Sequence, residues 1–573
     1  MQGPFREVWA VDFEFIHPEG ELPRPLCLVA WELRSGQKIR LWKDRFGRNP
    51  PYSIAADSLF VSYAAASELG CHLLLGWSMP ERVLDLLVEF RRAINTTPVH
   101  PVFKEPSLLK ALTYYGLDGV SAGEKTYWRE VIMRGEPYTE EEQNGILDYC
   151  ETDVVALARL LPVMVSRSHI DLPRALLRGR YMAAIARKLS ECRLIGTGLI
   201  VCANDGSRSK SSWSLVWAPN TGSMMKRARL VKSVLPGIFD GKAGGWPLHE
   251  DGRMDLKDKT FKAMATIHPE LEPLRQLRYS RDKLKLNELA VGQDGFNRCW
   301  LNPFGSRTSR NQPSNKKFIF GPAVWLRDFL IRPKEGWGLA YIDWISQEVG
   351  VLAGLSRDSA MMEAYNSEDF YITFGIQANL LPPGATGKTH KAERDPLKVV
   401  GLATQYGISS RSLAERINQP DIVGRQLLAC HRRVYKKGWN WSDNRVCRAL
   451  AHSKQETVFG WAHRFEDSPK VNSVRNFFVQ GNAAEMMRLA CCLATERGIL
   501  VNAPIHDALL IMSPTDQLPD DIAKTGACME EASAIVLNGF KLRTEAHPFL
   551  YPARFSDPKE RGKKMLSVVM GLL

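Results

Sequence analysis

Residues 394–407 read Arg394-Asp395-Pro396-Leu397-Lys398-Val399-Val400-Gly401-Leu402-Ala403-Thr404-Gln405-Tyr406-Gly407. Four side chains recur every four residues and would form one slowly rotating stripe on a helix: two cations, an apolar residue and an aromatic. They are Arg394, Lys398, Leu402 and Tyr406. The cations suit a triphosphate, and the other two suit a base and a sugar. The alternative is an ordinary amphipathic helix with solvated charges.

Two apolar segments with an aspartate at a strand end flank this helix in the sequence. The first, Leu339–Asp343, is followed by Gln347 and Glu348. The second, Ile505–Ile511, has Asp507 at a hairpin-like break. An aspartate at the end of a buried strand is usually a loop cap. If the two strands are neighbours, however, their aspartates would meet as a two-metal site.

Further carboxylates lie near the N-terminus. Asp12 and Glu14 are two apart in a strand-like segment and would point to one face, where two acids repel each other unless a cation lies between them. Tyr149 and Asp153 are four apart and would share one face of a helix. Each motif alone fits an acidic strand end or a surface helix. Together they can hold two Mg²⁺ ions, with the tyrosine orienting the attacking water.

The composition is that of a folded, basic protein. The 573 residues are 45% hydrophobic and carry a formal net charge of +13, which favours a polyanionic partner. The eleven cysteines are scattered, which predicts free thiols in a reducing, cytoplasmic compartment. Because no apolar run reaches the ~18 residues that span a bilayer, we expect no membrane segment.

The order of predicted elements indicates at least two parts. Residues 1–165 alternate strands and helices, as a small α/β domain does. The predicted strands are Val8–Phe13 and Pro25–Leu33, and the predicted helices are Pro80–Ile94, Glu140–Leu161 and Tyr181–Leu194. A seam is predicted at Ser166–Pro173. From about residue 301 strands alternate with long helices.

Residues 6–162 resemble the DEDDy 3′→5′ exonucleases, which are proofreading domains of the ribonuclease-H-like fold. Further matches are Ser107–Leu112, Tyr115–Leu117 and Ile146–Cys150. The resemblance implies that Asp12, Glu14 and Asp153 bind metal and that Tyr149 is catalytic. Where the family's middle motif supplies an aspartate this sequence has Glu68, with a solvated helix acid as the alternative. Asp85 lies farther on, where a further aspartate is common.

From about residue 180 to 550 the motifs resemble family A DNA polymerases, the Pol I-like group. The family pattern R-x-x-x-K-x-x-x-[FY]-x-x-x-Y-G is met except at Leu402. Three other segments resemble T-G-R-L-S-S-x-x-P, T-x-x-G-R and N-x-x-x-Q-G. They are Gly305–Pro313, Thr457–Gly460 and Asn476–Gly481.

The resemblance implies roles for the residues at matching positions. Asp343 and Asp507 would bind two Mg²⁺ ions, with Mn²⁺ as a substitute. Arg394 and Lys398 would hold the phosphates, with Lys398 as a general acid for pyrophosphate. The other implied dNTP contacts are Leu402, Tyr406, Glu348 at the ribose-excluding position, Gln347 and Tyr371. The implied DNA contacts are Arg307, Asn476, Gln480 and His506.

Three departures from the family pattern bear on nucleotide binding. Gln347 is shifted by one position, Ala508 follows Asp507 where a glutamate is usual, and Tyr371 stands where a phosphate-contacting histidine is common.

Together the resemblances imply an α/β plus α+β protein, a ribonuclease-H-like exonuclease followed by a right-hand polymerase. The expected parts are an exonuclease at 1–165, the thumb and the start of the polymerase at 175–300, and palm and fingers at 301–573, with fingers helices at about 365–480. Expected partners are primer–template DNA, dNTPs and other replication proteins, with the chain as a monomer. Because the exonuclease match starts at residue 6, no 5′-nuclease is expected, which is similar to compact bacteriophage enzymes. The DpoZ-like branch of 2-aminoadenine phages stays open.

Three alternatives follow from the same motifs. A single-subunit RNA polymerase has similar palm and fingers motifs, but a proofreading domain and Glu348 disfavour it. A non-catalytic DNA-binding descendant is disfavoured because the principal acids are all present. A nuclease whose C-terminal half only grips DNA is disfavoured by the complete stripe at residues 394–406.

Overall fold

We describe the protein from a computed structural model. The described residues are 4–97, 106–118, 122–189, 245–249, 254–271, 275, 288–321 and 327–556. The chain forms two compact units. The first comprises Met1–Arg193, Val291–Pro313 and Pro333–Ala553, and the second comprises Leu194–Ala290, Ser314–Arg332 and Arg554–Leu573. Much of the predicted thumb segment, residues 190–244, lies outside the described residues.

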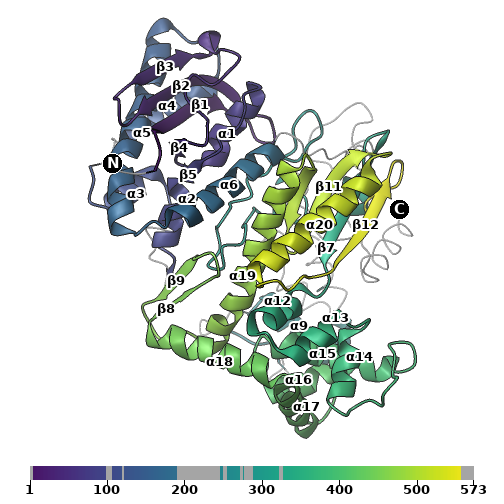
Figure 1. The fold of residues 1–573 in the computed structure, drawn as a ribbon. Helices are drawn as coiled ribbons and strands as arrows, with labels where there is room; N and C mark the ends of the chain where they lie inside the picture. The colour runs from purple at the N-terminus through teal and green to yellow at the C-terminus, as the bar shows by residue number, and fades with distance from the viewer. Residues whose placement is uncertain are drawn as a thin grey trace. The chain divides into compact units, whose positions relative to one another are not determined.

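The N-terminal part of the first unit is built on a five-stranded sheet of order β3-β2-β1-β4-β5 (Figure 1). Its central strand pairs antiparallel with β2 and parallel with β4. The strands are β1 (Glu7–Ile16), β2 (Arg24–Glu32), β3 (Lys38–Trp42), β4 (Ser58–Ser62) and β5 (Val83–Asp85). Both strands predicted from the sequence are therefore confirmed, and β1 carries Asp12 and Glu14 at the centre of the sheet.

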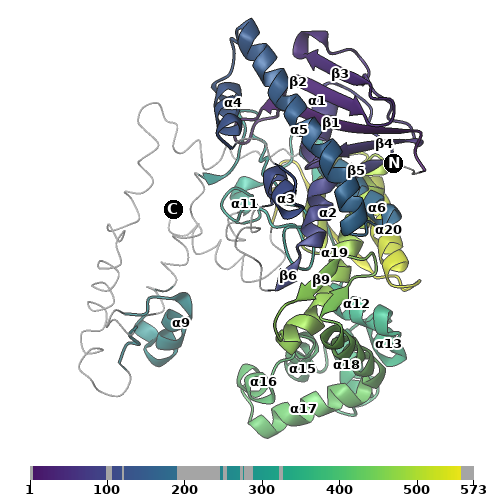
Figure 2. The same cartoon turned by 90° about the vertical axis from the view of Figure 1, so that its left-hand side faces the viewer.

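Helices pack against this sheet (Figure 2). The long α5 (Glu140–Arg167) packs on β1 and β2, and α1 (Ala65–Leu74) packs on α6 (Leu172–Leu189). A capping box begins α5, because Thr139 Oγ1 accepts from the Glu142 amide at 3.1 Å and Glu142 Oε2 accepts from the Thr139 amide at 3.0 Å. The predicted seam is the short turn between α5 and α6. Shorter helices are α3 (Leu108–Tyr114) and α4 (Ala122–Arg134).

The predicted helix at Pro80–Ile94 is wrong in its first half. This segment forms strand β5 and then α2 (Leu86–Ala93), because the Asp85 side chain accepts from the amides of Leu87 and Val88 and begins the helix there. The predicted Tyr181–Leu194 helix starts earlier than expected, at Leu172 of α6.

A second sheet, of order β10-β11-β7-β12, lies in the C-terminal part of the first unit (Figure 1). Its antiparallel strands are β7 (Trp337–Trp344), β10 (Leu500–Ile505), β11 (Ala508–Pro514) and β12 (Thr544–Leu550). Trp344 Nε1 donates to the Met529 carbonyl of α20 (Leu518–Val536) at 3.3 Å. Because neighbouring strand residues point to opposite faces, Asp343 points away from α20.

Helices fill the chain between β7 and β10. They are α12 (Gln347–Ser356), α13 (Ser359–Asn366), α14 (Phe370–Gln377), α15 (Lys391–Thr404), α16 (Ser410–Ile417), α17 (Asp421–Val434), α18 (Lys436–Ala451) and α19 (Val471–Glu496). The helices expected at about 365–480 are thus present. A small third sheet pairs β6 (Thr96–Thr97), β9 (Ala462–Phe465) and β8 (Lys454–Glu456).

The described part of the second unit includes α9 (Asp258–Ile267) and the short α11 (Arg327–Leu330). Its apolar cluster consists of Trp246, Met254, Phe261, Met264 and Leu271. Within the residues that the structure describes, no helix has both the length and the hydropathy needed to cross a membrane.

Candidate functional site

The two C-terminal aspartates lie side by side, as their strand positions predicted. Asp343 is near the end of β7, and Asp507 is in the turn between β10 and β11, where its carbonyl accepts from the Trp344 amide at 3.2 Å. His506 precedes it, exposed, with a φ of 51° that lets the turn close. Burial and the charge of Asp507 raise the pKa of Asp343 to about 6. Two neighbouring carboxylates of this kind favour a bound cation.

The surroundings of Asp343 fit a divalent ion. Its Oδ1 is buried, and none of the described residues donates a hydrogen bond to it. Asp343 pairs with Ala508 of β11 on one side and with Glu545 of β12 on the other, so the carboxylate next to Asp343 comes from β12 rather than β11. One ligand atom each of Asp343, Glu545 and His547 lie within 4.8 Å of one another. The sequence analysis missed Glu545 and His547, although their spacing of two on a predictable strand places them on one face.

A cavity of about 140 Å³ lies beside the aspartates. Its lining residues come from three separate segments of the chain: Ser346, Gln347, Glu348, Val349, Leu402, Gln405 and Asp507. Four of them are residues that we predicted to be catalytic or to bind nucleotide. The fold therefore brings the start of α12, the end of α15 and the β10–β11 turn around one space.

Tyr406 and Glu348 contact each other at this cavity. The Tyr406 hydroxyl donates a hydrogen bond to the Glu348 carboxylate, and Arg310 Nη2 lies 3.8 Å from Glu348 Oε1. Burial and the bond to Glu348 raise the pKa of Tyr406 to about 12. Tyr406 is 38% exposed and Leu402 is 41% exposed, so the stripe faces outward rather than into a core. Arg310 lies within a quoted motif, but its pairing with Glu348 was not predicted.

The cations of the stripe lie on α15. The Arg394 guanidinium forms an ion pair with Asp369, which also caps α14, and lies 5.4 Å from the centroid of the Tyr371 ring. Lys398 is exposed one turn farther along the helix. Arg394 is thus held by a carboxylate that a bound phosphate would have to replace or share.

Three of the predicted DNA-contacting residues lie in two places, the loop that carries Arg307 and the helix α19. The Arg307 carbonyl accepts from Asn95 Nδ2 and Trp461 Nε1, both at 2.9 Å, so its backbone is fixed while its side chain is exposed. Asn476 and Gln480 are one turn apart on α19, and Gln480 also hydrogen-bonds the Tyr406 side chain. Gln480 therefore links α19 to the cavity.

Comparison with known proteins agrees with this geometry, because residues 320–547 match DNA polymerase family A. Residues 320–547 form a family A DNA polymerase domain. This confirms the family that the motifs around Arg394 and Asp507 predicted.

Relatives of the family A domain match parts of the chain. The thermostable DNA polymerase I of Thermus thermophilus is 26% identical over 310 residues, 49% of this chain and 36% of that enzyme. The DNA polymerase of Mycobacterium phage L5 is 26% identical over 256 residues, 43% of this chain and 40% of that protein. The chain therefore spans well under half the length of these relatives.

A solved structure shares the fold. The POL domain of Pol1 from M. smegmatis, in complex with DNA primer-template and dNTP, has a TM-score of 0.62 with this chain at 15% identity, over 94% of both chains. At this level of identity the likeness concerns the fold alone.

A second group of acids lies outside the family A domain, on β1 and α5. One carboxylate oxygen each of Asp12, Glu14 and Asp153 lie within 4.8 Å of one another. Burial and the charge of Asp153 raise the pKa of Asp12, and burial and the charge of Asp12 raise that of Glu14. Tyr149 lies one turn before Asp153 on α5. Three desolvated carboxylates that repel one another fit a divalent cation.

The two acids of the middle motif lie next to this group. Glu68 is buried on α1, and its Oε2 accepts from the Phe13 amide of β1 at 2.8 Å. Burial raises the pKa of Glu68 most, and the negative charge of the nearby Asp12 raises it further. Asp85 accepts from the amides of Ala64 and Ala65 as well as from α2, which makes it a cap for two helices.

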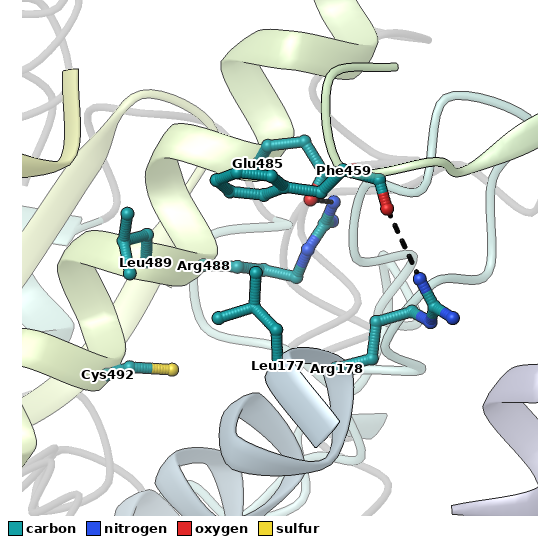
Figure 3. Close-up of a pocket in the computed structure, with 7 residues that line it drawn as sticks. All are labelled: Leu177, Arg178, Phe459, Glu485, Arg488, Leu489 and Cys492. Carbon is teal, nitrogen blue, oxygen red and sulfur yellow. Dashed lines mark hydrogen bonds and ion pairs between the residues drawn. The ribbon is translucent and has the colours of Figure 1, made fainter. Parts of the chain in front are cut away.

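A smaller cavity lies between α6 and α19 (Figure 3). Its volume is about 10 Å³, room for roughly one water molecule. Arg488 forms an ion pair with Glu485 at 2.6 Å, and Arg178 Nη1 donates to the Phe459 carbonyl at 3.4 Å (Figure 3). The remaining lining residues are Leu177, Leu489 and Cys492. This cavity is a packing gap and holds no predicted site residue.

Proposed function

We propose that the chain is a template-directed DNA polymerase that transfers nucleotides from dNTPs to a primer 3′-hydroxyl. The observation that supports this most strongly is the cavity lined by Glu348, Leu402 and Asp507, beside Asp343, in a family A domain. It joins an acid pair suited to metal with a surface suited to a sugar and a base.

The residues divide the chemistry among them. Asp343 and Asp507 would hold Mg²⁺, or Mn²⁺ in its place, and the bound ion would supply charge stabilisation for phosphoryl transfer. Arg394 and Lys398 bind the triphosphate, and the Lys398 ammonium gives a proton to the departing pyrophosphate. The nucleotide contacts are Leu402, Tyr406, Glu348, Gln347 and Tyr371. The primer–template contacts are Arg307, Asn476, Gln480 and His506.

We further propose that residues 1–165 are a 3′→5′ proofreading exonuclease of the ribonuclease-H-like fold. Asp12, Glu14 and Asp153, supported by the buried Glu68, would hold the metal, and Tyr149 would orient water at the scissile phosphate. We also propose the domain assignment made from the sequence. Residues 175–300 would form the thumb and the start of the polymerase, and residues 301–573 would form the palm and fingers.

The biological setting that we propose is replication of phage DNA in the cytoplasm of an infected host. The similarity to the polymerase of phage L5 supports it. The chain would act as a monomer with other replication proteins, and membership of the DpoZ-like branch is a narrower form of the same proposal.

One primer-extension gel tests both activities. With dNTPs and Mg²⁺ we expect a labelled primer to lengthen along its template, and without dNTPs we expect it to shorten from the 3′ end. Extension with rNTPs in place of dNTPs would instead support a single-subunit RNA polymerase. Shortening without any extension would support a nuclease with a DNA-gripping C-terminal half.

A further inference from the structure

Lys125 lies inside the N-terminal acid group, although no motif pointed to it. It belongs to α4, and its Nζ is 2.5 Å from Asp153 Oδ1. The two side chains are only 20% and 14% exposed. The same Nζ is 5.8 Å from the centroid of the Tyr149 ring. An ammonium group is thus paired with the acid and lies near the tyrosine that the proposed excision reaction uses.

This contact differs from an ordinary surface ion pair, and α5 itself offers the comparison. Two residues before Asp153, Glu151 pairs with Lys38 Nζ at 2.8 Å and with Arg40. The Glu151 side chain is 22% exposed, but its partners Lys38 and Arg40 are 40% and 38% exposed. That pair joins α5 to the edge strand β3. Lys125 instead directs its charge at the mutually repelling acids, and Arg129, one turn later on α4, adds a second positive charge toward Asp153.

A carboxylate that ligates a metal no longer needs an ammonium partner. Lys125 would then be released beside Tyr149, on a flexible stem whose compact charge suits a phosphate. We propose that Lys125 is a phosphate-binding residue of the exonuclease site. It is held on Asp153 in the free protein and transfers to the 3′-terminal phosphodiester when DNA occupies the site. This inference rests on the proposed exonuclease function.

The test removes either the Lys125 charge or the charge of the 3′-terminal phosphate. The whole protein and its K125M, K125R and K38M variants are mixed with a labelled single-stranded oligonucleotide in Ca²⁺, and Kd is measured by fluorescence anisotropy. A second oligonucleotide carries a neutral methylphosphonate at its 3′-terminal linkage. We expect the wild type and K38M to prefer the natural oligonucleotide about tenfold. This preference should vanish in K125M and return in K125R.

The outcomes separate the two proposals. If K125M keeps the tenfold preference, Lys125 does not bind that phosphate, whatever the exonuclease does. If the wild type does not shorten single strands in Mg²⁺, the exonuclease function fails, and the Lys125 inference with it. Primer extension should be unchanged in K125M, and a loss of extension together with a lowered Tm would overturn a local role.

Discussion

The Tyr406 hydroxyl donates a hydrogen bond to the Glu348 carboxylate, so the turn just after α15 is joined to the start of α12 at the edge of the cavity. In the proposed reaction Glu348 lies against C2′ of the incoming sugar, where a 2′-hydroxyl would meet a carboxylate fixed by its partner. Glu348→Ala should therefore raise ribonucleotide incorporation by about one order of magnitude or more, which is ~1.4 kcal/mol per tenfold. The measurement is single-nucleotide kcat/KM for rNTP and dNTP.

Excision must be silenced for that comparison, so both enzymes carry Asp12→Ala. Gln347, buried and lining the same cavity, provides the matched variant. Gln347→Ala should lower dNTP use without changing the rNTP/dNTP ratio. An unchanged ratio in Glu348→Ala together with a raised ratio in Gln347→Ala would transfer the discriminating role to Gln347.

The two acid groups predict separable activities. Asp343→Ala should abolish primer extension and leave shortening intact, whereas Asp12→Ala should do the reverse, because each acid lies on its own sheet. Losses of several orders of magnitude are expected when a metal-binding carboxylate is removed from a phosphoryl-transfer site. Rates of extension and shortening of one labelled primer–template give both values. Normal shortening by Asp12→Ala would refute the exonuclease assignment.

The N-terminal acids also predict a pH dependence of stability. The pKa of Glu14 is raised by burial and by Asp12, so the folded state binds more protons than the unfolded chain and loses stability as the pH rises through that raised pKa. Glu14→Gln should raise the Tm in EDTA at pH 8. The gain should shrink as the pH falls, because the raised pKa of Glu14 lets the folded wild type take up a proton there.

The control for this effect is Glu19→Gln, an exposed glutamate on the loop after β1. It should leave the Tm in EDTA within about a degree of the wild type, since surface substitutions change stability little. Added Mn²⁺ should stabilise the wild type more than Glu14→Gln at pH 8. An equal gain in both proteins would show that Glu14 is not a ligand.

Residue periodicity predicted much of both sites. A spacing of two on β1 placed Asp12 and Glu14 on one face, and a spacing of four placed Tyr149 and Asp153 on another. The stripe on α15 followed from the same rule. These spacings follow from the local geometry of strands and helices, so they can be read from the sequence before the tertiary fold is known.

The sequence analysis missed contacts that depend on how different elements pack together. The pairing of Glu545 with Asp343 depends on the register of β12 beside β7, and the pairing of Lys125 with Asp153 depends on how α4 packs on α5. The helix predicted at Pro80–Ile94 started too early, because the pairing of β5 with β4 depends on contacts that the local sequence does not show. In each case packing selects one partner among many that the sequence allows.

A buried charge cluster links α2 to α6 within the first unit. Glu89 of α2, 1% exposed, accepts hydrogen bonds from Arg178 of α6 at 2.6 and 2.9 Å and from Arg92 at 3.1 Å. Removing one member of a buried ion pair leaves the other charges unpaired, which costs ~3–5 kcal/mol. Glu89→Ala should therefore lower the free energy of unfolding by about that amount, measured by urea denaturation. Glu151→Ala, at a half-buried site whose partners Lys38 and Arg40 are themselves exposed, should cost ~1 kcal/mol or less. Glu89→Ala and Arg178→Ala together should cost less than the sum of the two single changes, because each change removes the same pair. Equal losses for Glu89→Ala and Glu151→Ala would show that burial does not strengthen this cluster.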